Sequence, residues 1–170
     1  MKIHNGFTLV ELMSILVIST TLISIAVPNF NSLYAHYRAD SSIRVIQQTL
    51  QMARNTAISY GISITTCPLV ENRCNDNWRL GLTVFTDSGK RNIIDGTDII
   101  IYQTSPFKDE DTVIYNRASI RFQPDGLASG TNGTLKYCPT TPDSQYSRAV
   151  IINQAGRVRF STKEGISCRN

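Results

Sequence analysis

Residues 7–27 read FTLVELMSILVISTTLISIAV and carry one charge, that of Glu11. As an α-helix that rises about 1.5 Å per residue, this stretch is roughly 30 Å long, which is enough to cross the hydrocarbon core of a bilayer. A core helix of a soluble protein would rarely lack lysine and arginine over such a length. We therefore predict that residues 7–27 form a membrane-spanning helix.

The flanking charges predict the orientation of this helix. Lys2 precedes it, and no charged residue follows it until Arg38. The positive-inside rule then favours a cytoplasmic N-terminus, with the bulk of the chain outside the cytoplasm. A secretory signal fits less well, because the apolar run is too long and no small-x-small cleavage site follows it.

Glu11 needs a specific explanation, because a carboxylate within a membrane costs about 2.5–3.5 kcal/mol and is retained only where something pairs with it. The segment 6–12, GFTLVEL, closely resembles the class III signal of type IV pilins and type II secretion pseudopilins. The resemblance implies that a prepilin peptidase cleaves between Gly6 and Phe7 and methylates Phe7. It also implies that Glu11 neutralises the terminal amine of a neighbouring subunit during filament assembly.

After the apolar run, a second helical pattern begins. Pro28 is expected to kink or weaken the helix, since proline cannot donate the helical hydrogen bond. Apolar residues then recur every three or four positions and predict a helix packed on a sheet, namely Ile43, Ile46, Leu50, Ala53 and Ala57. Gly61 is expected to end it. We predict one long helix from about Phe7 to Tyr60.

Beyond Gly61 the apolar period changes to two, which is typical of strands. We expect strands at residues 62–67, 78–86, 98–103, 112–115, 118–123, 133–138, 148–153 and 157–161, separated by glycine-containing turns. The predicted fold class is α+β and type IV pilin-like, with a long N-terminal helix packed on an antiparallel β-sheet head. The expected segments are a leader (1–6), a transmembrane and assembly helix (7–28), an amphipathic helix (29–61) and a β-rich head (62–170).

Five motifs narrow the resemblance. They are LQMARNTAI at 50–58, CP at 67–68, WRLGLTVFTD at 78–87, FQPDG at 122–126 and GRVR at 156–159. Their order and spacing are similar to those of the GspH/FimT group, which includes the minor pilins FimT and FimU and the pseudopilin GspH. The resemblance is weakest over residues 105–116, where the acidic run at 109–111 matches no motif that we recognise. The implied partners are other major and minor pilins, the prepilin peptidase and the inner membrane, with no cofactor.

The four cysteines lie in the part of the chain that we place outside the cytoplasm, where disulfides persist. Three pairings are open. We favour Cys67–Cys74, which closes a small loop, and Cys138–Cys168, which ties the last residues to a strand. Zinc is disfavoured because the cysteines do not form the close pairs that zinc sites use.

The sequence favours a protein that is not an enzyme. Neither a phosphate-binding glycine-rich loop nor a nucleophile elbow is recognisable. His36 is the only histidine after the expected cleavage point, and no nucleophile accompanies it. The acidic loop at 87–98 lacks the regular spacing of calcium loops, so we interpret it as a solvated hairpin connection.

The net charge of +4 is concentrated at the C-terminus. Residues 136–170 hold six lysines and arginines against two acids, a difference of +4, and residues 1–135 hold eleven of each. In the predicted hairpin of residues 148–161, Arg157 and Arg159 lie on one face of a strand. Two guanidinium groups about 6.6 Å apart can contact phosphates, and Arg148, Lys163 and Lys136 could widen the patch.

In FimT proteins a G-R-x-R motif near the C-terminus is associated with DNA binding in natural transformation, and Gly156 to Arg159 resembles it at every position. The resemblance implies a minor pilin of the inner membrane and then of the pilus at the cell surface, which captures double-stranded DNA. Three alternatives remain open: edge-strand charges that only discourage aggregation, a pilus-priming minor pilin without DNA binding, and a type II secretion pseudopilin of the GspH type.

Overall fold

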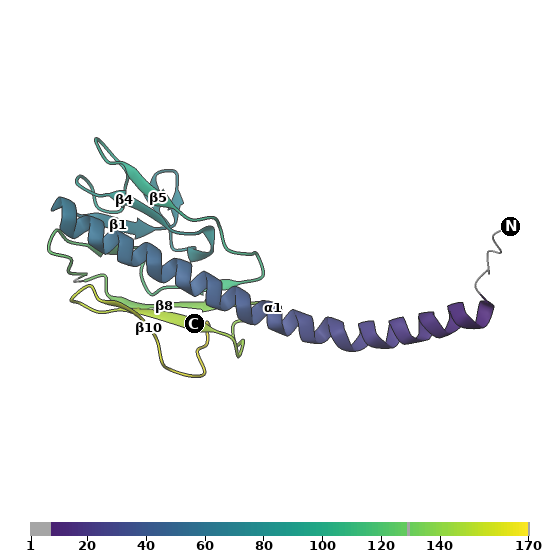
Figure 1. Cartoon of the computed structure of the whole chain (residues 1–170). Coiled ribbons are helices and arrows are strands. Elements are labelled where there is room, and N and C mark those ends of the chain that lie inside the picture. Colours follow the sequence, from purple (N-terminus) through teal and green to yellow (C-terminus); the bar gives the residue numbers. More distant parts are fainter. Residues whose placement is uncertain (1–7, 129, 170) are drawn as a thin grey trace. The chain divides into compact units, whose positions relative to one another are not determined.

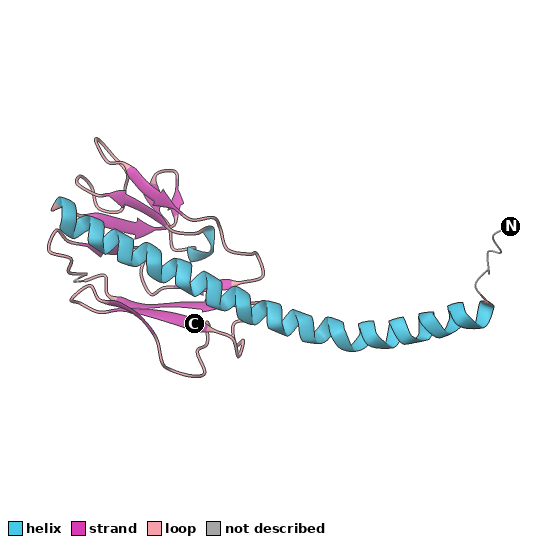
Figure 2. Cartoon of the chain, in the orientation of Figure 1, coloured by secondary structure: helices cyan, strands magenta, loops and turns pink. Residues whose placement is uncertain are grey.

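The computed structural model describes residues 8–128 and 130–169, and of Pro28 and Asn29 it describes the backbone alone. The predicted cleavage site between Gly6 and Phe7 lies outside the described residues. A single long helix precedes all the strands, as Figure 2 shows, and this confirms the predicted α+β class.

Helix α1 (Leu9–Tyr60) begins and ends with recognisable caps. The Thr8 hydroxyl accepts a hydrogen bond from the amide of Glu11 at 3.3 Å, as an N-cap side chain does. At the other end Gly61 has φ of +63°, and the amide of Ile62 donates to the carbonyl of Ala57 at 3.2 Å, which is a Schellman cap. The backbone is helical at Pro28 and on both sides of it.

The chain divides into two compact units, one up to Ala35 and one from His36 to Asn170. In the first unit the described residues form the start of α1, and nearly all of their side chains are exposed. By length and composition this part of α1 is apolar enough to cross a membrane. The second unit, which we call the head, contains the rest of α1 and the strands.

Two four-stranded antiparallel sheets form the head. The first has the order β5 (Ile100–Gln103), β4 (Thr83–Thr86), β1 (Ile64–Cys67) and β7 (Ile120–Phe122). The second has the order β10 (Val158–Phe160), β9 (Arg148–Ile152), β8 (Gly133–Cys138) and β6 (Thr112–Ile114). Strands β5 and β10 are therefore edge strands among the described residues.

The head part of α1 packs on both sheets, as Figure 1 shows, with β1 and β4 to one side of it and β8 and β10 to the other. The predicted apolar stripe is buried throughout. It joins one core with side chains of both sheets, among them Ile64, Val84, Phe122, Leu135, Tyr137, Val150 and Val158. Burial of this shared apolar surface is the main stabilising contribution to the head.

One strand prediction needs correction, and one small hairpin lies outside the predictions. The strand expected at 78–86 starts at Thr83, because Trp78–Leu80 forms a 3₁₀-helix whose buried indole donates to the carbonyl of Arg117 at 3.0 Å. A small hairpin of β2 (Leu69–Val70) and β3 (Arg73–Cys74) was not predicted. Its strands are too short to show any period, and Glu71 and Asn72 both adopt positive φ in its turn.

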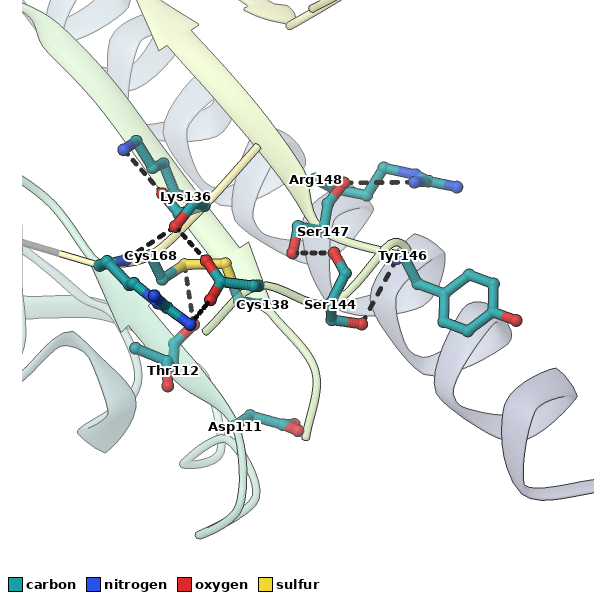
Figure 3. Close-up of a disulfide and its surroundings, with 12 residues drawn as sticks. Asp111, Thr112, Lys136, Cys138, Ser144, Tyr146, Ser147, Arg148 and Cys168 are labelled. Atoms are coloured by element: carbon teal, nitrogen blue, oxygen red, sulfur yellow. Dashed lines mark hydrogen bonds and ion pairs between the residues drawn. A yellow bond between two sulfur atoms is a disulfide. The ribbon is translucent and has the colours of Figure 1, made fainter. Parts of the chain in front are cut away.

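Both disulfides favoured by the sequence are present. Cys67–Cys74 closes the β2–β3 hairpin, with its Cα atoms 5.5 Å apart. Cys138–Cys168, shown in Figure 3, joins β8 to the last residues of the chain. Its Cα atoms are 6.2 Å apart. No free cysteine occurs in residues 8–128 and 130–169.

The acidic run at 109–111 anchors its loop to α1. Arg38 of α1 donates to Glu110 at 2.5 Å and to Asp111 at 2.8 Å. The buried Asp111 carboxylate also accepts the Tyr137 hydroxyl at 2.5 Å and the Thr140 amide at 3.2 Å. Burial would lower the pKa of Arg38, but the Glu110 hydrogen bond and the Asp111 charge outweigh it and raise that pKa.

We predict that Asp111→Asn destabilises the head by about 3 kcal/mol, because it removes one partner of a buried ion pair. The control is Asp143→Asn, which weakens the surface ion pair with Arg169 and should cost less than about 1 kcal/mol. Thermal unfolding of the full chain in detergent, with the disulfides intact, measures both. Equal melting temperatures for the two variants would contradict a structural role for Asp111.

Candidate nucleic-acid interface

The hairpin of β9 and β10 displays two arginines on the edge of the second sheet. Val158 pairs with Ile152, and Arg159 pairs with Ile151, so β10 lies antiparallel to β9. Val158 is buried, whereas Arg157 and Arg159 are exposed. Successive side chains of a strand point to opposite faces, so both guanidinium groups lie on the outer face, about 6.6 Å apart along the strand.

The turn before these arginines is held in a defined conformation. Gly156 has φ of +72°, and its amide donates to the carbonyl of Asn153 at 3.0 Å. The side-chain oxygen of Asn153 accepts the amide of Arg157 at 2.8 Å. A Cβ atom at position 156 would collide with the carbonyl oxygen of Gly126, so the close approach of these two turns requires glycine as well.

Arg54 of α1 links the same two turns. Its Nε donates to the carbonyl of Gly126 at 3.2 Å, and one of its terminal nitrogens donates to the carbonyl of Ala155 at 3.3 Å. Arg54 therefore fixes the start of the GRVR segment against the helix. Sequence reasoning did not assign Arg54 to the site, because its partners are carbonyls about 70 and 100 residues away.

Two of the cations expected to widen the patch, Arg148 and Lys136, already have partners elsewhere in the head. The Nε of Arg148 lies 2.8 Å from a carboxylate oxygen of Asp40, and another of its nitrogens lies 3.3 Å from the ring of His36. Lys136 donates to the carbonyl of Ser167 at 2.8 Å, beside the Cys138–Cys168 disulfide in Figure 3. Arg169 pairs with Asp143.

By contrast, Arg157, Arg159 and Lys163 form no ion pair with any described acidic residue. Lys163 follows β10 in an exposed loop, where its amide donates to the Ser161 hydroxyl at 3.2 Å. The hairpin therefore presents fewer unpaired cations than its composition indicates. Arg157 and Arg159 form its centre.

Glu11 lies in the first turn of α1, with its side chain exposed. Among the residues that the structure describes, no cation pairs with it. Gly6 and Phe7, the other two residues of the predicted processing and assembly site, lie outside those residues.

In the acidic loop at 87–98, carboxylates accept hydrogen bonds from backbone amides of the same loop. Asp98 accepts hydrogen bonds from the amide and hydroxyl of Ser88 at 3.0 and 2.7 Å, and Asp95 accepts the amide of Lys90 at 3.2 Å. Burial would raise the pKa of Asp98, but these bonds from Ser88 lower it. Within residues 8–128 and 130–169, no three His, Cys, Asp or Glu side chains cluster as metal ligands would.

Two comparisons relate the chain to known proteins. The family model for "Type II transport protein GspH" matches residues 42–156. Two crystal structures of the type IV minor pilin FimU of Pseudomonas aeruginosa are similar in fold, each at 22% identity. One has a TM-score of 0.61 and covers 77% of this chain and 95% of that chain, and the other has a TM-score of 0.60 with 76% and 99%.

No curated protein matches the sequence significantly. The family match spans well over half of the chain, and the FimU structures share its fold over about three quarters of its length. The chain therefore belongs to the GspH family, and its fold is that of a type IV minor pilin.

Proposed function

We propose that this protein is a minor pilin that captures double-stranded DNA at the surface of a type IV pilus. The observation that carries the proposal is the pair Arg157 and Arg159, which are exposed on an edge strand and have no acidic partner among the described residues. Its mechanism is assembly and presentation rather than catalysis, in keeping with a family of structural pilins.

Assembly depends on the N-terminal part of the chain in this proposal. Residues 1–6 are a leader that the prepilin peptidase removes, and residues 7–28 hold the protein in the inner membrane with the head in the periplasm. The carboxylate of Glu11 meets the methylated amine of Phe7 in an adjoining subunit, which neutralises two charges that would otherwise be costly in an apolar fibre core. Residues 29–61 continue the helix, and from Ala39 onward its apolar side chains join the core of the head.

DNA capture depends on phosphate contacts. An arginine can donate two parallel hydrogen bonds to one phosphate, and two arginines at alternate strand positions can reach neighbouring phosphates. Such contacts do not distinguish bases, so binding should be independent of sequence and sensitive to salt. The ordered turn at Gly156 supports the proposal, because it holds both side chains on one face before DNA arrives.

The match to a family described as a type II transport protein favours a second candidate, a pseudopilin of a type II secretion system. In that case deletion would trap exoproteins in the periplasm. A minor pilin would instead be needed for surface pili. The arginine variants below separate DNA capture from both roles.

Replacing both arginines, as Arg157→Gln with Arg159→Gln, should raise the Kd for duplex DNA about tenfold or more at low salt, because two phosphate contacts are lost. The melting temperature should change by no more than about 2 °C, since neither side chain has a described partner. Fluorescence anisotropy with a labelled duplex and the full chain in uncharged detergent measures binding.

The matched control is Arg73→Gln with Arg91→Gln, which removes the same charge from two other exposed arginines of the head. It should leave the Kd within about twofold. Retention of wild-type affinity by the Arg157 and Arg159 double variant would reject DNA capture by this hairpin.

Replacing Glu11 by glutamine should remove the protein from purified fibres while leaving its amount in the membrane unchanged, because the isosteric amide cannot neutralise the terminal amine. Immunoblots of sheared pili and of membranes measure both pools. Glu71→Gln, at an exposed turn of the head, is the control. Normal incorporation of the Glu11 variant would refute the assembly contact.

A further inference from the structure

A groove lined mainly by polar and basic side chains runs beside the arginine hairpin, and Asp40 is the one acid among its described lining residues. From Ser41 to Tyr60, α1 contains Arg44 and Arg54 and no aspartate or glutamate, and residues 148–163 contain no acid either. These two segments face each other across the surface between α1 and β10, which we call the α1–β10 groove. The proposed function assigns no role to the helix side of this groove.

Two adjoining cavities make up the groove. The larger, about 560 Å³, is lined on the helix by Gln47, Gln51, Arg54 and Asn55 and on the strand by residues 157–160. The smaller, about 230 Å³, is lined on the helix by Asp40, Ile43 and Arg44 and on the strand side by Arg148, Ala149, Phe160 and Ser161. Phe160 lines both cavities, so they adjoin at this side chain, with the GRVR segment beside the larger cavity and Arg44 beside the smaller.

The helix side of the groove offers hydrogen-bond donors and positive charge. Gln47 and Gln51 are four residues apart, so their amides lie on the same face of α1. Arg44 is exposed, and no ion pair to it occurs among the described residues. Arg54 uses two of its five N–H groups on backbone carbonyls. Asp40 lines the Arg44 end of the groove, where its charge is balanced by Arg148 at 2.8 Å.

We propose that one strand of the bound DNA follows the α1–β10 groove, so that the binding site extends from Arg157 to Arg44. This inference rests on the proposed function and extends it. Arg44 and Arg54 are ten residues apart, which is about 15 Å along the helix axis. That distance matches roughly four nucleotides of one strand at about 3.4 Å each. Arg44 supplies a phosphate contact, and the amides of Gln47 and Gln51 donate to the same backbone.

The test compares helix variants in the full chain, in uncharged detergent, by anisotropy with a labelled 30-base-pair duplex over a range of salt concentrations. Arg44→Gln should raise the Kd about three- to tenfold and lower the salt slope by about one. Gln47→Glu should raise the Kd by at least as much, because its carboxylate would repel phosphates. Neither change should alter the melting temperature, since both sites are on the helix surface.

Two controls match these changes. Gln48→Glu places the same charge about 100° further round the helix, and Arg73→Gln removes the same charge from the separate β2–β3 hairpin. Both should leave the Kd within about twofold of wild type. An equal loss of affinity in all four variants would mean that net charge alone governs binding. That result would overturn the proposed path of DNA along the groove.

The outcome also distinguishes the two proposals. If the Arg44 and Gln47 variants bind as wild type while the Arg157 and Arg159 double variant does not, the groove is wrong and the hairpin stands. If the double variant binds DNA as wild type does, the proposed DNA capture is rejected. The proposed path of DNA along the groove is then rejected with it. Loss of affinity in the double variant and in both helix variants, with both controls unchanged, supports both.

Discussion

The burial of one face of α1 against two sheets is the constraint on which the rest of the head depends. Ile46 and Leu50 are fully buried there, and Ala39, Ala53 and Ala57 leave room for strands on both sides of the helix. Neither sheet could cover its own apolar face without this shared helix. Because the stripe occupies one face, the polar side chains of α1 remain outside, and those nearest β10 line the groove beside the hairpin.

Longer-range contacts then fix the outer elements on this core. Arg38 ties α1 to the 109–111 loop through the buried Asp111, and Arg54 ties it to the turns at Gly126 and Ala155. Burial raises the pKa of Tyr137, and its bond to Asp111 acts in the same direction, so alkaline pH above the usual tyrosine pKa of about 10 should destabilise the packing around Tyr137. The Cys138–Cys168 disulfide holds the last residues on β8.

The features that can be predicted from the sequence are those that depend on local periodicity. The helical stripe, the fold class and the strand at 133–138 agree with the structure, because apolar spacing and turn residues determine them over a few positions. The sequence does not predict contacts between distant segments. The pairing of Arg148 with Asp40 joins residues 108 apart. The anchoring role of the acidic run and the assignment of Arg54 to the site likewise depend on tertiary packing, which no local pattern reports.

The proposed contact of Arg157 and Arg159 with DNA is tested most directly by arginine footprinting. The full chain is treated with phenylglyoxal, with and without saturating duplex DNA, and modification is measured at each arginine by mass spectrometry. We expect DNA to slow modification of Arg157 and Arg159 several-fold while the exposed Arg73 reacts at the same rate. Unchanged rates at Arg157 and Arg159 when DNA is bound would contradict the account.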